Sequence, residues 1–325
     1  MKTVYPDYYE NFRCIADKCR HNCCIGWEID IDPDTLELYE NTPGDLGKRL
    51  KDNISLEGTP HFILAENERC PFLNPKNLCD IYSSLGENCL CQICSDHPRF
   101  YNELPTHTEA GLGLCCEEAA RIILTEKEPF KLINFPEEAL SDPVLLLRDD
   151  AFQILQNREI PLIERAETLV NFVSSHCVLS NIKSVFSSHI KHYLPLFESL
   201  EKMDEKWGSL LLSLKNPVLP EVLSDFECLI DEKGLEPMFE QFVCYLIYRH
   251  MPKAEFEEDA LLYIGFSLLA LRLIYSLSLD VFLKNGDFSL EDLLCLVRLF
   301  SCEIEYSDEN IDKILDFLEE EIFSS

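Results

Sequence analysis

The spacing of hydrophobic residues divides the chain into two parts. From residue 126 onward, segments such as LIERAETLVNFV (162–173) and IDKILDFLEEEIF (311–323) place apolar residues three and four positions apart, which predicts amphipathic helices. Residues 1–125 show no long stretch with this period and are expected to be rich in loops. The sequence therefore predicts a mostly α fold, with a cysteine-rich region carrying short strands over residues 1–125 and an acidic all-helical domain over residues 126–325.

Short elements are predicted inside the first region. The segment WEIDID (Trp27–Asp32) alternates apolar and polar residues, as a short strand does. Asp32 and Pro33 then suit the N-cap and first position of a helix. A second short strand is predicted in HFIL (His61–Leu64), and short helices are predicted at Ile81–Leu85 and Cys116–Leu124.

One segment of the second region is long and apolar enough to raise the question of a membrane span. Ala260–Leu279 is apolar for almost all of its 20 residues, and Arg272 interrupts it. A charged side chain at the bilayer centre costs about 2.5–3.5 kcal/mol, and no basic cluster flanks the segment to orient it. We therefore expect the central buried helix of a helical domain, with a membrane span as the alternative.

The charge of the chain limits its partners. It has 59 acidic and 28 basic residues and a formal net charge of −31. Nucleic acids and anionic membranes require a basic face, so neither is expected as a partner, whereas a lysine-bearing protein would be attracted. The first residues, MKTVYPDYYENF, contain no apolar signal segment, so a cytoplasmic, reducing location is expected.

Cysteine is concentrated in the first region. Of 16 cysteines, eleven lie before residue 117, namely Cys14, Cys19, Cys23, Cys24, Cys70, Cys79, Cys89, Cys91, Cys94, Cys115 and Cys116. In a reducing compartment such clustering favours a metal site over a disulfide framework or a core of free thiols. Four thiolates serve both zinc and iron–sulfur clusters, so spacing does not separate the two. His21, His97 and His107 could add zinc ligands, although hydrogen-bonding roles are more common for such histidines.

Two common cofactor motifs are missing from the sequence. The chain has no glycine-rich loop of the dinucleotide or P-loop type. The Cys-x3-Cys-x2-Cys spacing typical of radical S-adenosylmethionine enzymes starts at Cys19 and Cys23 but has Gly26 at its third position. A conventional cofactor-binding domain is therefore not expected.

Four segments together resemble the flagellin lysine-N-methylase family. They are YPDYYENFRC (Tyr5–Cys14), CRHNCCIGWEIDID (Cys19–Asp32), RCPFLNPKNLCDIYSSLGENCLCQICSDHPR (Arg69–Arg99) and CEEAARIIL (Cys116–Leu124). The resemblance covers residues 1–125. His97 stands where tyrosine is more usual in the family, and Glu117 stands where proline is common.

The resemblance implies methyl transfer from S-adenosylmethionine to lysine side chains of a protein such as flagellin. It also implies an iron–sulfur centre, most simply of the 4Fe–4S type, with zinc as the alternative. The family's cysteine pattern falls on Cys14, Cys19, Cys23, Cys24, Cys70, Cys79, Cys91, Cys94 and Cys116. Cys89 and Cys115 lie outside that pattern.

The chemistry of the implied cofactor suggests two further residues. The ring of Trp27 could hold the sulfonium cation, and Arg99 could hold the methionine carboxylate, although packing and a salt bridge are the ordinary roles of such residues. The sequence identifies no catalytic residue. Two other functions stay open. One is a non-enzymatic protein-interaction module whose fold is held together by a bound metal, and the other is an iron–sulfur redox protein.

Overall fold

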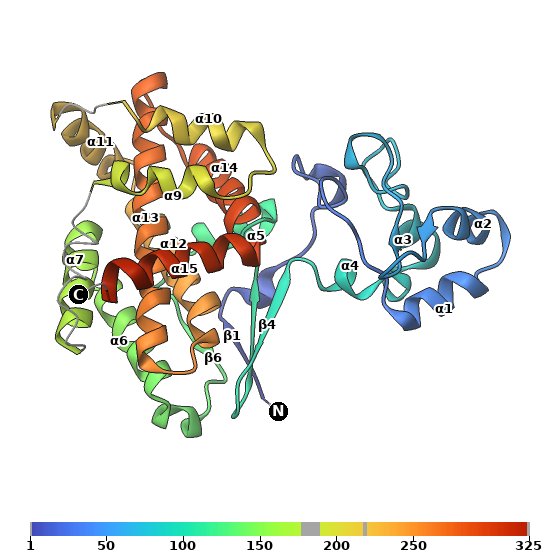
Figure 1. Ribbon diagram of the computed structural model, residues 1–325, viewed down its shortest axis with the longest axis horizontal. Helices are drawn as coiled ribbons and strands as arrows, with labels where there is room; N and C mark the ends of the chain where they lie inside the picture. Colours follow the sequence, from blue (N-terminus) through green and yellow to red (C-terminus); the bar gives the residue numbers. More distant parts are fainter. Residues whose placement is uncertain (1, 177–188, 217–219, 324–325) are drawn as a thin grey trace. The chain divides into compact units, whose positions relative to one another are not determined.

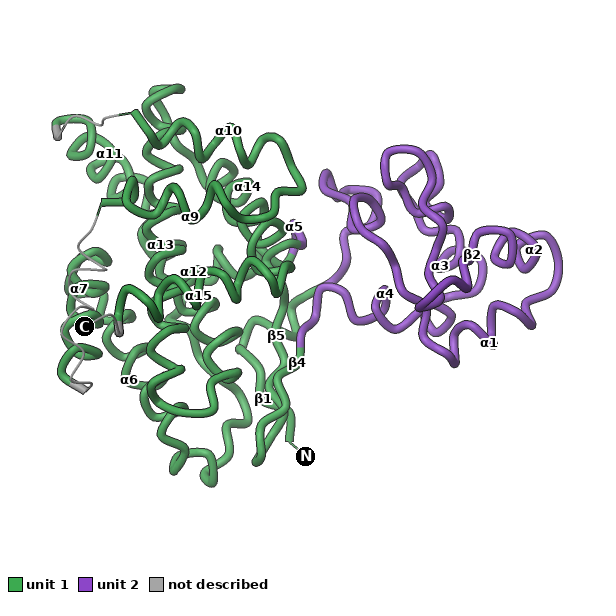
Figure 2. Tube along the Cα trace, viewed as in Figure 1, with its two compact units in different colours: residues 1–12, 101–115, 119–325 green, residues 13–100, 116–118 purple. Residues whose placement is uncertain are grey.

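The computed structural model describes residues 2–176, 189–216 and 220–323 (Figure 1). This part of the chain is mostly helical with a few short strands, as predicted. It forms two compact units (Figure 2). Unit 1 comprises Met1–Phe12, Tyr101–Cys115 and Ala119–Ser325, and unit 2 comprises Arg13–Phe100 and Cys116–Glu118. The bounds of these units differ from the boundary at residue 125 that the composition suggested.

A four-stranded sheet explains why the N-terminus belongs to unit 1. Its strands lie in the order β4 (Arg99–Glu103), β5 (Thr108–Leu112), β1 (Thr3–Pro6) and β6 (Leu132–Ile133). Strand β1 runs parallel to β5 and antiparallel to β6. The hydroxyl of Tyr248 donates to the carbonyls of Val4 and Ala110, at 3.3 and 3.0 Å. The sheet is thereby joined to the helices that follow it in sequence.

Helices make up the rest of unit 1. They are α5 (Glu117–Leu124, whose first two residues belong to unit 2), α6 (Pro143–Leu155), α7 (Leu162–His176), α9 (Leu194–Ser199), α10 (Glu205–Ser213), α11 (Pro220–Glu232), α12 (Glu236–His250), α13 (Glu257–Asn285), α14 (Leu290–Phe300) and α15 (Asp308–Phe323). A π-helical turn, Ser301–Glu305, follows α14 directly. Helix α13 packs against α12, α14 and α15, so it forms the centre of the unit.

Helix α13 contains the long apolar segment noted in the sequence. Within the described ranges it is the one helix long and apolar enough to cross a membrane. In the structure 72% of its apolar window is buried inside the protein. The prediction of a central buried helix is confirmed.

Unit 2 is built from short elements. These are α1 (Pro33–Asn41), α2 (Gly44–Asp52), β2 (Ile54–Ser55), β3 (His61–Phe62), α3 (Asp80–Leu85) and α4 (Gln92–Asp96). Asp32 is the N-cap of α1, because its Oδ1 accepts the amide of Thr35 at 3.0 Å, and Pro33 is the first helical residue. The predicted cap is confirmed, and so are the short helices near Ile81–Leu85 and Cys116–Leu124, which correspond to α3 and α5.

The predicted strand at Trp27–Asp32 is wrong. Ile29 and Ile31 are buried as the alternation implied, but the segment forms only an isolated bridge between Asp30 and His61. The amide of Ile31 donates to the carbonyl of Pro60 at 2.7 Å. Because proline has no amide N–H to donate in return, the ladder cannot extend. The predicted strand at His61–Leu64 is shorter than expected and ends at Phe62.

Candidate functional site

Six cysteines share the small hydrophobic core of unit 2. Cys70 and Cys91 are buried in it, and Cys24, Cys79, Cys89 and Cys94 pack against it. The rings of Tyr39, Phe62 and Phe72 form its aromatic part, with the centroids of Phe62 and Phe72 4.9 Å apart. Cysteines from three separated segments are therefore gathered in one place. Cys89, which lies outside the family pattern, is among them.

Backbone geometry fixes the direction of several of these cysteines. Cys79 is the N-cap of α3, where its Sγ accepts the amide of Tyr82 at 3.5 Å. Cys91 is the N-cap of α4. The amide of Cys70 donates to the carbonyl of Cys24 at 2.8 Å, which joins the first cysteine segment to the second. Partial positive charge at a helix N-terminus favours the thiolate form of cysteine, but burial outweighs it at Cys79 and raises the pKa of that thiol.

Charged and polar side chains hold the loop between Cys70 and Cys79. The guanidinium of Arg49 donates to Asp80 at 2.6 Å and to the carbonyl of Pro71, and Asn74 donates to the other oxygen of Asp80 at 2.9 Å. The same guanidinium lies over the ring of Phe72, 5.1 Å from its centroid. No spacing in the sequence signals this long-range set, and sequence reasoning missed it.

The N-cap carboxylate of α1 has a second contact at the start of α4. Oδ2 of Asp32 accepts the amide of Gln92 at 2.8 Å, directly after Cys91. The hydroxyl of Tyr39, also on α1, donates to the carbonyl of Cys89 at 2.8 Å. Helix α1 thus positions the segment that carries the third group of cysteines.

Two neighbouring thiol pairs are polarised by hydrogen bonds. The Cys24 thiol donates to Cys23 and lowers the pKa of Cys23 to about 7, with desolvation opposing. The Cys94 thiol likewise lowers the pKa of Cys91. In each pair the bond raises the pKa of the donor, Cys24 or Cys94. One thiol of each pair is therefore ready to act as thiolate, the form that binds metal.

The remaining thiols of this core are electrostatically coupled to the pairs. Burial, with a smaller contribution from the neighbouring Cys79 and Cys91, raises the pKa of Cys70 to about 11. Cys70 also adds to the raised pKa of both Cys24 and Cys94. The six residues Cys23, Cys24, Cys70, Cys79, Cys91 and Cys94, called here the inner cysteines, therefore act on one another's ionisation.

The other three predicted ligands, Cys14, Cys19 and Cys116, are not among the inner cysteines. Cys14 is exposed, and its Sγ accepts the amide of Ala16 at 3.4 Å. The thiol of Cys19 donates to the carbonyl of His21 at 3.1 Å and lies 3.7 Å from Glu117. Burial raises the pKa of Cys19 to about 11. Cys116 is half-buried, immediately before Glu117.

Glu117 ties the first cysteine segment to the start of α5. Its carboxylate accepts the amides of Arg20 and His21, at 2.9 and 3.3 Å, and pairs with the Arg20 side chain at 3.0 Å. Burial acts to raise the pKa of Glu117, but these bonds hold it below its ordinary value. The contact spans almost one hundred positions in sequence, so sequence reasoning could not find it.

The predicted cofactor residues and histidines have different surroundings. The indole N–H of Trp27 donates to the carbonyl of Cys23 at 2.6 Å, and its ring lies 6.3 Å from that of His97. Arg99 is half-buried at the start of β4. His107 is buried in unit 1, where its ring nitrogens lie 2.8 Å from Thr106 and 3.3 Å from Glu109. Both ring nitrogens of His107 therefore have hydrogen-bond partners in this structure.

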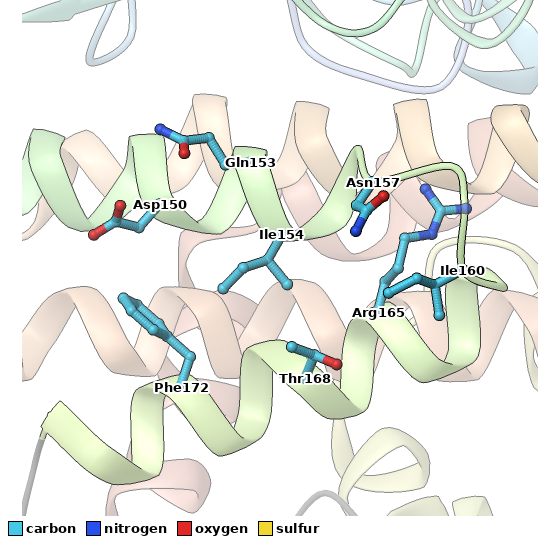
Figure 3. A pocket seen from close by; sticks show the side chains of 8 residues that line it. All are labelled: Asp150, Gln153, Ile154, Asn157, Ile160, Arg165, Thr168 and Phe172. Carbon is cyan, nitrogen blue, oxygen red and sulfur yellow. The ribbon is translucent and has the colours of Figure 1, made fainter.

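Two hollows are lined by helices of unit 1. One, of about 310 Å³, lies between α6 and α7, and the side chains of Ile154 and Phe172 point into it (Figure 3). The other, of about 420 Å³, lies between α13 and α15 and is lined by Asp259, Tyr263 and Asp312 among others. No predicted ligand or cofactor residue lines either hollow.

The inner cysteines fit a metal centre in donor chemistry. The cysteines of residues 14–94 are thiols without disulfides, and six of them are close enough to affect one another's pKa. Within the described ranges, however, no three His, Cys, Asp or Glu side chains have the arrangement of a formed metal site. The Nε2 atom of His97 is buried and has no hydrogen-bond partner there. The fit to a metal centre thus rests on the thiol chemistry of the inner cysteines and on their closeness to one another.

Comparison with known proteins gives distant matches to two kinds of bacterial protein. Over 134 residues, 39% of the chain, the identity is 27% to the flagellar biosynthetic protein FliU of Salmonella muenchen, of which 79% is covered. The same identity and share of this chain apply to lysine-N-methylases of Salmonella choleraesuis and Salmonella typhimurium, of which 33% is covered. The chain thus spans about a third of the length of these two enzymes.

Two further comparisons gave no match. No family model matches the chain, and no solved structure is significantly similar to it.

Proposed function

We propose that the chain is a protein-lysine methyltransferase that uses S-adenosylmethionine and acts on a protein with exposed lysines, such as flagellin. The observation that carries the proposal is the 134-residue match to proteins named lysine-N-methylase. A protein named for flagellar biosynthesis matches at the same identity, which supports a flagellar substrate. The match covers only a third of the length of each methylase. It therefore supports the proposal but does not by itself establish the activity of this chain.

The charge of the chain suits such a substrate. Its formal net charge is −31, so a protein that presents lysine side chains would be attracted over distances of the order of the Debye length. The same charge repels nucleic acid and anionic lipid. We accordingly propose a protein partner and a cytoplasmic location.

The reaction makes limited demands on the protein. Bound S-adenosylmethionine supplies an electrophilic methyl group on sulfur. The Nζ of the substrate lysine, in its neutral form, forms the new N–C bond as the S–C bond breaks, and the nitrogen then loses a proton. The protein has to hold the two groups in line. Trp27 is the candidate for contact with the sulfonium, and Arg99 is the candidate for the methionine carboxylate.

The cysteines are the proposed holders of a metal centre. An iron–sulfur cluster needs about four thiolates, and the inner cysteines exceed that number, while Cys14, Cys19 and Cys116 are not among them. We propose that the inner cysteines supply the cluster ligands, with zinc as the alternative metal. Thiols must lose their protons to bind metal. In the polarised pairs that cost is lowered for Cys23 and Cys91 and raised for their donors, Cys24 and Cys94.

The proposal is tested by methyl transfer. The full chain, purified without oxygen, is incubated with S-adenosylmethionine labelled in the methyl group and with flagellin, and label on lysine is located by mass spectrometry. Label should depend on the chain and be lost in Cys91→Ser but kept in Cys228→Ser, which changes an exposed cysteine of α11 in unit 1. If no lysine acquires label while the protein holds its metal, the methyltransferase proposal is wrong.

The share of each relative's length that the match covers supports a second function. The FliU protein, whose printed name states no enzymatic activity, is matched over 79% of its length, against 33% for the methylases. This favours a module in which metal holds unit 2 together and the acidic chain binds a partner. Such a module should take up metal without binding S-adenosylmethionine, which isothermal titration of the metal-loaded chain would measure.

A further inference from the structure

His97 occupies a distinctive position in unit 2. It is the C-cap of α4, the helix that begins at Cys91 and carries Cys94, and its own amide donates to Ile93 at 3.2 Å. Its Nε2 is buried and makes no hydrogen bond to any described residue. A buried polar atom without a partner is costly, so such an atom in a folded protein calls for a ligand.

Three residues with metal-binding side chains follow one another along α4 and its caps. Cys91 is the N-cap, Cys94 lies within the helix and His97 is the C-cap, although no three such side chains among the described residues form a metal site in this structure. Cys91 and Cys94 are hydrogen-bonded to each other. The unpartnered imidazole of His97 thus lies at the end of the short helix that carries one thiol pair of the inner cysteines.

A second contact connects His97 to the other thiol pair. The ring of His97 lies 6.3 Å from that of Trp27, at an interplanar angle of 33°. The indole N–H of Trp27 in turn donates to the carbonyl of Cys23, at 2.6 Å. His97 is therefore joined through the chain to Cys91 and Cys94 and through Trp27 to Cys23 and Cys24.

We infer that Nε2 of His97 is a further ligand of the metal centre, alongside thiolates of the inner cysteines. Mixed thiolate and imidazole sets bind zinc and also occur in iron–sulfur centres. The inference rests on the metal centre of the proposed function, but not on methyl transfer.

The test uses cobalt, whose visible spectrum reports the ligands of a thiolate or imidazole site. The reduced full chain is titrated with Co²⁺ without oxygen, as wild type, as His97→Phe and as His61→Phe. Phenylalanine keeps a ring beside Trp27 but removes the nitrogen. His61→Phe is the control, since His61 lies in the same unit and its Nδ1 is already 2.8 Å from the carbonyl of Thr59.

Wild type and His61→Phe should bind Co²⁺ alike, and His97→Phe should bind at least about tenfold more weakly, with an altered spectrum. X-ray absorption of the zinc-loaded wild type should show one nitrogen among the sulfur ligands, a readout that needs no variant. Equal affinity and spectrum in His97→Phe, or an all-sulfur zinc shell, would overturn the inference and leave methyl transfer unaffected. Failure of the wild type to bind Co²⁺ and zinc would overturn this inference and the zinc alternative, and would leave methyl transfer to its own test.

Discussion

Individual charged side chains are buried in unit 1 as hydrogen-bonded groups. Arg148 donates two bonds to Glu109, at 2.8 and 2.7 Å, and His107 lies 3.3 Å from the same carboxylate. Burial acts to raise the pKa of Glu109, but the charge of Arg148 and these hydrogen bonds hold it below its ordinary value. The pair is therefore ionised, and neither partner can be removed alone without leaving a buried charge.

Removal of Arg148 should be strongly destabilising. Arg148→Met leaves Glu109 buried without its counter-ion, which costs about 3–5 kcal/mol, measured as the free energy of urea unfolding. The double variant Arg148→Met with Glu109→Gln should recover much of that loss. Lys313→Met, which removes an exposed pair with Glu309 on α15, should have no measurable effect. A loss in Arg148→Met no larger than in Lys313→Met would contradict this view.

Buried His250 gives the stability of unit 1 a dependence on pH. Desolvation lowers the pKa of His250 from 6.5 to about 4, and its Nε2 lies 2.9 Å from Glu305. Between pH 6.5 and pH 4 the unfolded chain therefore binds a proton that the folded chain does not, so stability falls as the pH falls. From pH 7.5 to pH 5 the loss from this group should be about 2 kcal/mol.

The His250→Gln variant isolates this contribution. Glutamine carries no proton equilibrium, so the unfolding free energy of the variant should fall less steeply between pH 7.5 and pH 5 than that of the wild type. Urea unfolding at several pH values measures the difference. Parallel curves for the two proteins would show that His250 is not held neutral.

Among the secondary structure elements, two helices differ in their need for glycine. A Cβ on Gly47, in α2, would lie 1.8 Å from the carbonyl oxygen of Thr42, which ends α1. A Cβ on Gly208, in α10, would meet only the flexible side chain of Lys202, at 3.7 Å. Glycine is thus required where α2 packs against the end of α1, and is replaceable in α10.

Alanine at these two positions should have opposite effects. Gly208→Ala should stabilise the protein by about 0.5–1 kcal/mol through helix propensity. Gly47→Ala should destabilise unit 2 by about 1–3 kcal/mol, because α1 and α2 must move apart. Hydrogen exchange of the α1 and α2 amides measures the second effect and thermal unfolding the first. Slower exchange in Gly47→Ala would refute the close approach.

Local signals in the sequence predicted elements well where neighbouring residues decide the structure. The Asp32–Pro33 cap predicted the start of α1, and the apolar run predicted buried α13. The strand at Trp27–Asp32 failed because its pairing depends on Pro60, a residue distant in sequence. The two compact units have other bounds than the change in composition near residue 125, since β1 pairs with β5, about one hundred residues later.

For the chain as a whole, the sequence predicted metal binding by cysteines but not the contacts that hold the cysteine segments in place. Cysteine number and spacing indicated metal ligands, and the structure gathers six of the nine predicted cysteines as the inner cysteines. Arg49 with Asp80, the second contact of Asp32, and Glu117 with Arg20 hold those segments in place. Each contact joins residues distant in sequence, so no local pattern could reveal it. The metal and the cofactor stay predictions.

The central claim is that the inner cysteines hold an iron–sulfur centre. The most direct measurement is the iron, zinc and acid-labile sulfide content of the full chain purified without oxygen, together with its visible spectrum. The account predicts about four iron and about four sulfide per chain, lost in Cys24→Ser and kept in Cys228→Ser. Zinc without sulfide or visible absorption would contradict the iron–sulfur centre, and a chain that holds no metal would contradict the metal site altogether.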